Sequence, residues 1–293
     1  GHLPGCIDET ACNYNPNATR DDGSCWYAEE NHDCAGDCVV EIDCLDVCGG
    51  TAEVDAFGLC NNNNSLQGAI DLSEDGDVIT IPEGDYEEHI TLQKCITLKA
   101  EEDEDRAAGY KRVRMKRGTD IDFDERDDCE IVFEGLEFYG IDENADLEGY
   151  ENSVIYLTAE NSSISSLTIL NSEVDGDDSS DSYCFVGSNI ENLSFTGSIF
   201  RNCAGVVITG GDVSDHHINE SSFSGNSMNL YVSEISEGIL DATLNWWGTA
   251  NGPLGTIFGS INYAPWYIDE GLTQLVALDE CGEWGGSGFP EGT

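Results

Sequence analysis

Bulky apolar residues recur at a nearly constant interval along the second half of the chain. Phe200, Phe223 and Trp246 are spaced by 23 residues, and Leu167 and Leu193 are 26 residues apart. A repeat of about 20–30 residues is typical of stacked coils, in which each coil buries one face against its neighbours. Leucine-rich repeats have a similar period, but their L-x-x-L-x-L-x-x-N frame is absent. We therefore expect a solenoid built of some other repeating unit.

From about residue 66 the chain reads as short strands. Apolar and polar residues alternate over 78–81 and again over 90–98, with Pro and Gly between the segments. This pattern predicts an all-β coil. Asn202 and Asn226 follow the repeating Phe residues by two and three positions. Asn at such positions suits either a turn in the left-handed region or an inward ladder of amides.

Two segments resemble a known superfamily. The string GDVITIPEGDYEEHITL, from Gly76 to Leu92, looks like the first rungs of right-handed parallel β-helix proteins of the pectin-lyase-like superfamily. The string LNWWGTANGP, from Leu244 to Pro253, together with the APWYID that follows, resembles a closing-rung signature of the same superfamily. The resemblance covers about 210 residues. It implies a right-handed parallel β-helix, which we expect over 66–278, with a charged insertion at 100–128 and a Gly-rich tail at 279–293.

The first 61 residues have a different composition. Apolar content is low and no strand or helix period persists, so this segment needs disulfides, bound ions or a partner to hold a fold. The stretch from Gly5 to Cys25 resembles a short module, GC-x-D-x-x-A-C-N-Y-N-P-x-A-x-x-D-D-G-S-C, of secreted surface proteins in marine bacteria and microalgae. We expect a disulfide-rich, loop-rich segment whose pairing the sequence does not choose. Its cysteines are Cys6, Cys12, Cys25, Cys34, Cys38, Cys44, Cys48 and Cys60.

The remaining cysteines and the glycosylation motifs indicate an oxidising compartment. Rung spacing suggests that Cys95 pairs with Cys129 and Cys184 with Cys203, which leaves Cys281 as a free or intermolecular thiol because 13 is odd. Zinc spacings are absent, so disulfides outside the cytosol are the better interpretation. We expect an extracellular or cell-surface glycoprotein. The N-x-[ST] motifs begin at Asn17, Asn63, Asn161, Asn192 and Asn219.

The formal net charge is −48. Such a chain repels nucleic acid and anionic lipid, and no apolar run approaches the about 18 residues of a membrane span. We therefore expect no nucleic acid partner and no membrane insertion. A loop of closely spaced carboxylates suits calcium, although a solvated acidic loop is an equal alternative. These residues are Asp175, Asp177, Asp178 and Asp181; a second candidate calcium turn contains Asn13, Asn15, Asp21 and Asp22.

Six of the eleven basic residues lie within twelve positions. Three interpretations compete: a surface loop paired with its own acidic flanks, a docking patch for the acidic body of a second copy, and a dibasic processing site before Gly118. The second makes this cluster an assembly interface. Its members are Arg106, Lys111, Arg112, Arg114, Lys116 and Arg117.

The resemblance raises the question of polysaccharide chemistry. Lyases of this fold pair a calcium-binding carboxylate cluster with an Arg or Lys base, and their anionic substrate calls for a basic groove, unlike this acidic chain. Asp212, Asp215, His216 and His217 form the best candidate catalytic cluster, with an exposed polar turn as the alternative. We expect no catalysis, and instead a self-assembling structural subunit of an extracellular filament or surface appendage.

Two other functions stay open. The first is carbohydrate binding or adhesion through the aromatic residues Tyr263, Trp266 and Tyr267, which would otherwise pack the C-terminal cap. The second is a β-helix polysaccharide lyase or glycoside hydrolase.

Overall fold

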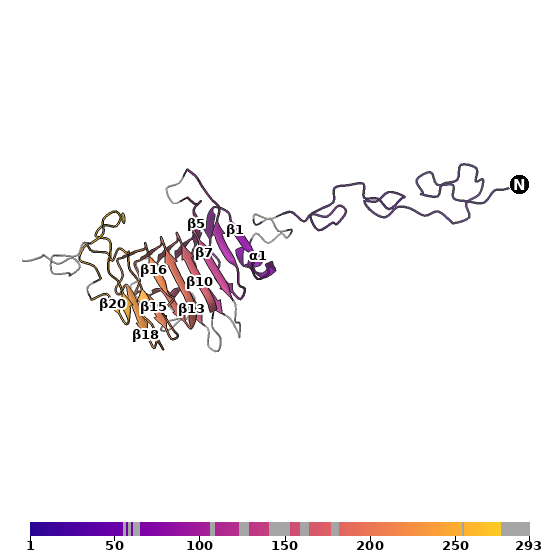
Figure 1. Cartoon of the computed structure of the whole chain (residues 1–293). Coiled ribbons are helices and arrows are strands. Elements are labelled where there is room, and N and C mark those ends of the chain that lie inside the picture. The colour runs from indigo at the N-terminus through magenta and orange to yellow at the C-terminus, as the bar shows by residue number, and fades with distance from the viewer. Residues whose placement is uncertain are drawn as a thin grey trace, which may run out of the picture. The chain divides into compact units, whose positions relative to one another are not determined.

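The computed structural model describes residues 1–54, 57, 60, 65–105, 109–122, 129–140, 153–158, 164–176, 182–253 and 255–276. The chain divides into two compact units, Gly1–Asn64 and Ser65–Thr293, and each is described by itself. The arrangement of strands in the second unit is shown in Figure 1.

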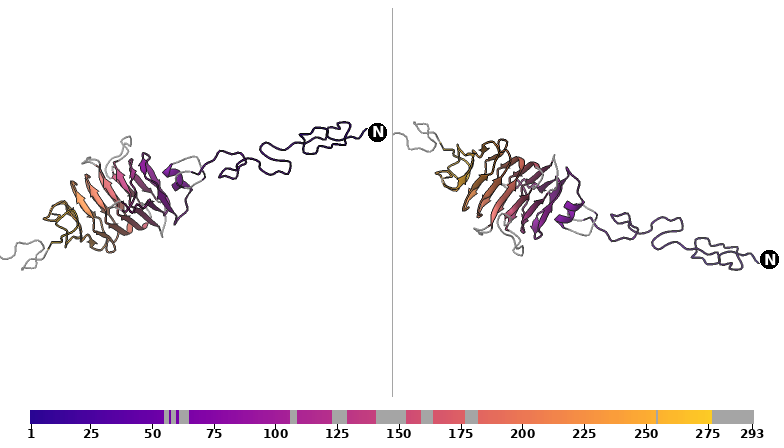
Figure 2. Two further views of the ribbon diagram at one scale, coloured as in Figure 1. Left: turned by 90° about the horizontal axis from the view of Figure 1, so that it is seen from above. Right: turned by 90° about the horizontal axis from the view of Figure 1, so that it is seen from below.

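The second unit is a parallel β-helix. Its strands form three sheets in which every pairing is parallel. Strands pair with those three places away in chain order, except at the end, where β18 pairs with β20 and β19 with β21. The chain therefore visits the three sheets in turn, one coil after another, and successive coils stack along one direction (Figure 2). This confirms the all-β coil expected from the sequence.

The strands of each sheet share one side of the coil. The eight-stranded sheet contains β1 (Val78–Ile81), β4 (Thr97–Ala100), β7 (Glu130–Glu134), β10 (Ile164–Leu170), β13 (Ile190–Thr196), β16 (His217–Asn219), β19 (Leu240–Asp241) and β21 (Ile261–Asn262). The six-stranded sheet contains β2 (Gly84–Tyr86), β5 (Val113–Met115), β8 (Glu137–Tyr139), β11 (Glu173–Asp175), β14 (Ile199–Arg201) and β17 (Ser222–Ser224). The seven-stranded sheet contains β3 (Ile90–Leu92), β6 (Thr119–Asp122), β9 (Ser153–Thr158), β12 (Tyr183–Ser188), β15 (Val206–Thr209), β18 (Leu230–Ser233) and β20 (Ile257–Phe258).

The recurring apolar residues are in register inside the coil. Leu167 lies beside Leu193, and Phe200 lies beside Phe223. The rings of Phe200 and Phe223 stack 5.2 Å apart at 13°, and Phe223 stacks on Trp247 at 4.9 Å. The 23-residue spacing predicted Trp246 at this position, and that prediction is wrong. Trp246 bridges to Ser222, so the next residue, Trp247, falls opposite Phe223 and is the buried one.

One corner of the coil is a two-residue turn. From the eight-stranded to the six-stranded sheet, the first of the two residues has positive φ in successive coils: Gly135 (71°), Asn171 (49°), Gly197 (61°) and Glu220 (52°). A Cβ on Gly197 would lie 2.5 Å from Asn171 Oδ1, so a side chain at this position would require the Asn171 amide to move. The left-handed turn that the sequence suggested for Asn202 is present at another corner, with φ 57°.

Both ends of the coil are covered. At the start, the short helix α1 (Leu66–Leu72) buries Leu66 and Ile70 and packs against β1 and β3. Its first N–H groups are satisfied because Glu88 accepts from Leu66 N at 2.7 Å. At the other end, the segment after β21 places the buried Trp266 and Val276 beside the last coil. Such caps keep strand edges from pairing with other chains.

The charged insertion expected at 100–128 is shorter than predicted. Strands β5 and β6 come from this stretch and pair in register with β2 and β8, and with β3 and β9. The coil therefore continues through 113–122, and the extra residues are confined to the connection between β4 and β5, residues 101–112. In β5 the residues alternate as in any half-buried strand: Val113 and Met115 are buried, and Arg114 faces outward. The many charged residues nearby made this strand pattern difficult to recognise in the sequence.

The first unit consists of short loops joined by disulfides. Asp33 and Asp43 each accept backbone N–H groups from two and four residues ahead, which fixes two successive turns. Antiparallel bridges close these turns at His32 with Cys38 and at Ile42 with Cys48. The disulfides here are Cys6–Cys25, Cys12–Cys34, Cys38–Cys48 and Cys44–Cys60.

Candidate functional site

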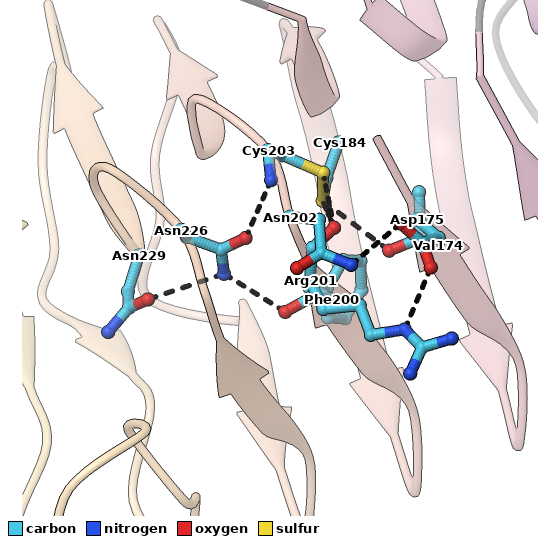
Figure 3. The surroundings of a disulfide bond; sticks show 9 residues. All are labelled: Val174, Asp175, Cys184, Phe200, Arg201, Asn202, Cys203, Asn226 and Asn229. Carbon is cyan, nitrogen blue, oxygen red and sulfur yellow. Dashed lines mark hydrogen bonds and ion pairs between the residues drawn. A yellow bond between two sulfur atoms is a disulfide. The ribbon is translucent and has the colours of Figure 1, made fainter. Parts of the chain in front are cut away.

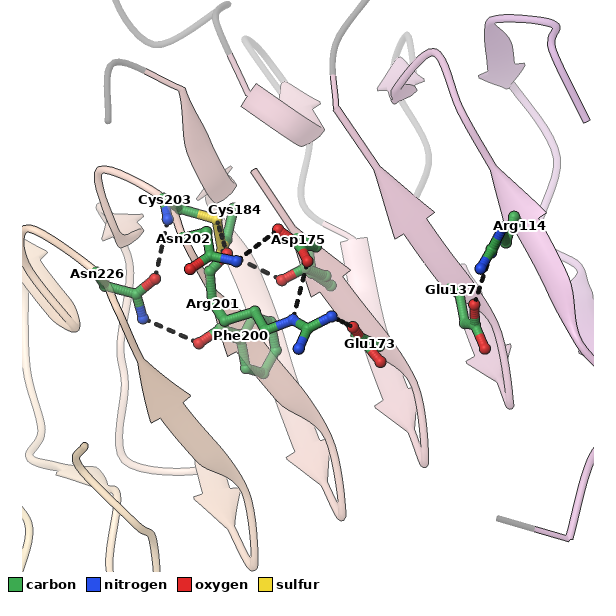
Figure 4. A network of polar contacts seen from close by, with 11 residues as sticks. Arg114, Glu137, Glu173, Asp175, Cys184, Phe200, Arg201, Asn202, Cys203 and Asn226 are labelled. Atoms are coloured by element: carbon green, nitrogen blue, oxygen red, sulfur yellow. Dashed lines mark hydrogen bonds and ion pairs between the residues drawn. A yellow bond between two sulfur atoms is a disulfide. The ribbon is translucent and has the colours of Figure 1, made fainter. Parts of the chain in front are cut away.

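The outer face of the six-stranded sheet carries a dense set of paired charges, which we call the charged face. Side chains alternate along each strand, so residues flanking the buried Phe138, Val174 and Phe200 point outward. Glu137 is in register with Arg114 on one side and with Glu173 on the other. Figure 4 shows the contact between Arg114 and Glu137 and the contact between Glu173 and Arg201. The charged face consists of Asp85, Arg112, Arg114, Lys116, Glu137, Tyr139, Glu173, Asp175 and Arg201.

At the start of this face the basic cluster has acidic partners in its own unit. Arg112 Nε and Arg114 Nε lie 2.9 Å and 3.2 Å from the same Glu137 oxygen, and Lys116 Nζ lies 2.9 Å from Asp85 Oδ2. The side-chain hydrogen bond to Asp85 raises the pKa of Lys116. The structure thus favours the first interpretation of the cluster, a surface paired with its own acids.

Of the other basic residues in the cluster, Lys111 follows the same pattern. Lys111 Nζ lies 2.7 Å from Glu101 Oε2. The carbonyl oxygen of Arg117 lies 2.9 Å from His89 Nδ1, in the turn before β6. Arg106 lies outside the described residues.

Further along the face, Arg201 holds two carboxylates of β11. Its Nε lies 2.9 Å from Asp175 Oδ2, and its guanidinium also forms an ion pair with Glu173. Asn202 Nδ2 donates to the second oxygen of Asp175 at 3.0 Å, which Figure 3 shows beside the Cys184–Cys203 disulfide.

Burial shifts the ionisation of this cluster. Burial raises the pKa of Glu173, and the neighbouring Arg201 opposes that rise. Burial also raises the pKa of Tyr139, whose ring lies 5.5 Å from the Arg114 guanidinium carbon. Perturbed carboxylates of this kind occur both in catalytic sites and in structural ion-pair networks. Sequence analysis missed Glu137, Glu173 and Tyr139; their one signal is that they flank the recurring core residues.

Of the four expected calcium ligands in this loop, Asp175 is the one among the described residues. Asp175 is 5% exposed, and both of its oxygens face Arg201 or Asn202. Asp177, Asp178 and Asp181 lie outside the described residues. Among the residues that are described, no group of three or more His, Cys, Asp and Glu side chains is arranged to hold a metal.

The second calcium candidate, in the first unit, is a set of turn-forming side chains. Asp21 Oδ1 and Asp22 Oδ1 each accept a backbone N–H two residues ahead, at 3.0 Å. Asn13 bonds both Ser24 and Trp26, and Asn15 Oδ1 accepts from Asn17 N at 3.0 Å. These contacts fix the turn itself.

The candidate catalytic cluster does not converge either. His216 is 1% exposed, whereas the next residue, His217, is exposed and lies 3.6 Å from Asp241. Burial lowers the pKa of His216 to about 4. Asp212 accepts from Ser214 N at 2.9 Å, and Asp215 is exposed. The two imidazoles therefore lie in different surroundings: that of His216 is buried, and that of His217 is at the surface.

The three candidate glycan-binding aromatics belong to the C-terminal cap. Trp266 is 6% exposed, and its Nε1 donates to Ala250 O at 3.3 Å. The Tyr263 ring lies 6.0 Å from that of Trp266, and Tyr267 bridges to Leu275. Trp266 thus matches the packing alternative that the sequence left open, whereas Tyr263 is exposed.

The cysteines of the coil form two disulfides. Cys95 pairs with Cys129 and Cys184 with Cys203, the two pairings suggested by rung spacing. Each one links neighbouring coils, because β4 adjoins β7 and β12 adjoins β15. With six disulfides among the described residues, the chain fits an oxidising environment. Cys281 lies outside the described residues.

The sequons differ in their surroundings. Asn17 and Asn192 are exposed, whereas Asn219 is half-buried and its Nδ2 donates to Thr243 O at 3.0 Å. Asn63 and Asn161 lie outside the described residues.

These features define the class of the protein: a parallel β-helix with a disulfide-stapled first unit and an internally paired charged face. Comparisons with models of protein families, with curated proteins and with solved structures found no match. The described part of the chain contains no helix with the length and apolar character needed to cross a bilayer.

Proposed function

We propose that this chain is a secreted, non-enzymatic structural protein, and that it assembles with copies of itself into an extracellular filament or surface appendage. The observation that carries the proposal is the covalent linkage of neighbouring coils, by Cys95–Cys129 and Cys184–Cys203, around a stacked aromatic core. Cross-links of this kind restrict the unfolded chain and stabilise the native coil. A stiff, reduction-sensitive coil suits a mechanical role outside the cell.

The resemblances support secretion and the β-helix. The match to the Cys-rich module of secreted surface proteins extends from Gly5 to Cys25, and the two pectin-lyase-like segments lie in the first and last coils. They do not indicate whether the chain is catalytic, which depends on its individual residues. On the charged face Arg201 pairs with both Glu173 and Asp175, so these carboxylates are committed to a stabilising network. We propose that the face is structural.

Electrostatics sets the conditions for assembly. At a net charge of −48, copies repel each other, and salt or divalent ions reduce that repulsion. We propose calcium as a counter-ion between copies. Lys116 and Arg112 already form ion pairs with acids of their own chain. Docking to a second copy would replace these ion pairs with intermolecular ones, so we propose that the basic cluster contributes little to docking.

Electron microscopy of the full chain, purified without reductant from a secretory host, tests this proposal. Ordered fibres in millimolar calcium are the expected result, and their loss in chelator or reductant would identify what holds them. Dispersed particles at high concentration in every condition would contradict it. Release of unsaturated products or reducing ends from uronate or neutral glycans would overturn the non-enzymatic part.

Two variants locate the contact. Lys111→Gln/Arg112→Gln removes two partly exposed charges of the basic cluster, and fibres are expected to persist. Cys281→Ser tests the intermolecular thiol expected from cysteine parity, and its fibres are expected to dissociate more readily. Loss of fibres only in the double variant would restore the cluster as the docking patch.

A further inference from the structure

Asn192 lies on the outer face of the eight-stranded sheet. It is on β13, in register with Ser166 of β10, and it is exposed, whereas the adjacent Leu193 points into the core. Ser194, the hydroxyl residue of the same N-x-S motif, is two positions on and therefore faces the same side of the sheet. The acceptor amide and the hydroxyl of this sequon thus share one face.

The surroundings of Asn192 are suited to a sugar. Beyond Glu191 at the start of β13, the outward residues of β10 and β13 are uncharged and mostly small hydroxyl side chains. These residues are Ser166, Thr168, Leu170, Ser194 and Thr196. Glu130 and Glu134 of β7 border this strip beside Ser166 and Leu170. A neutral glycan lying along β10 and β13 can hydrogen-bond to the hydroxyl groups there without covering those two charges.

Asn219 provides a contrast within the same sheet. Its Nδ2 donates to Thr243 O at 3.0 Å and to Thr243 Oγ1 at 3.3 Å, so both amide hydrogens point at one residue of the next coil. Its sequon Ser221 is fully buried, with Oγ donating to Asn219 O at 2.9 Å. A sugar on this nitrogen would displace the contact with Thr243.

We propose that Asn192 is an N-glycan attachment site and that Asn219, in the folded protein, is not. The inference rests on the proposed secretion of the chain. Nδ2 of Asn192 attacks C1 of the first sugar of a lipid-linked oligosaccharide diphosphate. The N–C1 bond replaces the C1–O bond, the lipid diphosphate leaves with that electron pair, and Nδ2 gives up one of its two protons. The glycan then covers the neutral strip of β10 and β13.

Enzymatic deglycosylation in heavy-oxygen water tests the assignment. The full chain is secreted from a eukaryotic host that glycosylates a reference protein, folded monomer is isolated, and each sequon peptide is read by mass spectrometry. Label is expected at Asn192 and at the exposed Asn17, and none at Asn219. Asn192→Gln and Ser194→Ala should each remove one glycan from the intact mass, and the matched control Asn219→Gln should remove none.

The outcomes separate the two proposals. Unlabelled Asn192, or labelled Asn219 in folded monomer, overturns the assignment whether or not fibres form. Labelled Asn192 in a chain that never forms fibres supports the glycan site and counts against the filament.

Discussion

Arg201 of β14 reaches across one strand spacing to Asp175 of β11, with its Nε 2.9 Å from Asp175 Oδ2. Asp175 is buried, and Asn202 occupies its other oxygen. The pair therefore links β11 to β14 at the register position where Asp175 lies beside Arg201. It differs from most surface ion pairs, because removing one partner leaves a buried charge.

Replacement of Arg201 by Leu is expected to destabilise the coil by about 2–4 kcal/mol, since Asp175 then lacks its cation. Urea unfolding followed by circular dichroism measures the change. Arg112→Leu is the matched control. Arg112 is more exposed and Arg114 still pairs with Glu137, so its effect should stay below about 1 kcal/mol. Equal losses in both variants would show that burial of Asp175 is immaterial.

Phe223 lies between two aromatic neighbours in the core, so Phe223→Ala is expected to cost about 3–5 kcal/mol. Both stacking contacts and the packed volume are lost together. The same unfolding assay applies, with Phe258→Ala as the control, because Phe258 is 48% exposed at the last strand. A loss below about 1 kcal/mol for Phe223→Ala would mean that the core collapses around the cavity.

The two coil disulfides should differ in strength because they close loops of different length. Cys95 and Cys129 are separated by 34 residues and Cys184 and Cys203 by 19. Loop-closure entropy predicts about 2–4 kcal/mol for either pair changed to Ala, with the longer loop costing about 0.5 kcal/mol more. Denaturant midpoints of the two double variants check the order. A reversed order would point to native-state packing as the larger contribution.

His216 should make the coil sensitive to mild acid. Its pKa is about 4 in the folded chain, below the ordinary 6.5, so between these values the unfolded chain binds more protons. The contribution of His216 to the free energy of unfolding is complete above about pH 6.5. It is lost as the pH falls from about 6.5 to about 4, and the total loss is about 3 kcal/mol. The nearby charges are Asp212, Asp215 and His217, which do not offset the burial.

His216→Phe should flatten this part of the stability profile. The measurement is the difference in unfolding free energy between about pH 7 and pH 4.5, compared with the unmodified chain to remove the titration of the many carboxylates. His217→Gln, at an exposed position, should leave the difference unchanged. An unchanged slope in His216→Phe would assign the acid sensitivity to other groups.

The fold was predictable because, in stacked coils, the sequence spacing between buried residues also sets the register between neighbouring strands. The structure pairs Leu167 with Leu193 and Phe200 with Phe223, the same residues that the sequence spacing related to each other. The same rule failed at Trp246, because one residue of slip exchanges inside for outside. It failed again at Arg114, where charge density outweighed a strand pattern three residues long.

The charged face was less accessible to sequence reasoning. Glu137 and Glu173 are 36 residues apart, and only the stacking of β8 on β11 brings them together. The outward positions carry no period of their own, since solvent accepts many residue types there. Asn226 was closer to prediction. Its amide accepts from Cys203 N at 3.0 Å and donates to Phe200 O at 2.9 Å, as an inward ladder requires.

The corner between the eight-stranded and six-stranded sheets shows how this protein can change in length. It has two residues at Asn171, Gly197 and Glu220, but it holds residues 101–112 between β4 and β5. The strands on either side of that longer connection still pair in parallel with their neighbours. Extra residues can therefore leave the stack at this corner, and a whole coil can be added or removed, without altering the register of the remaining strands.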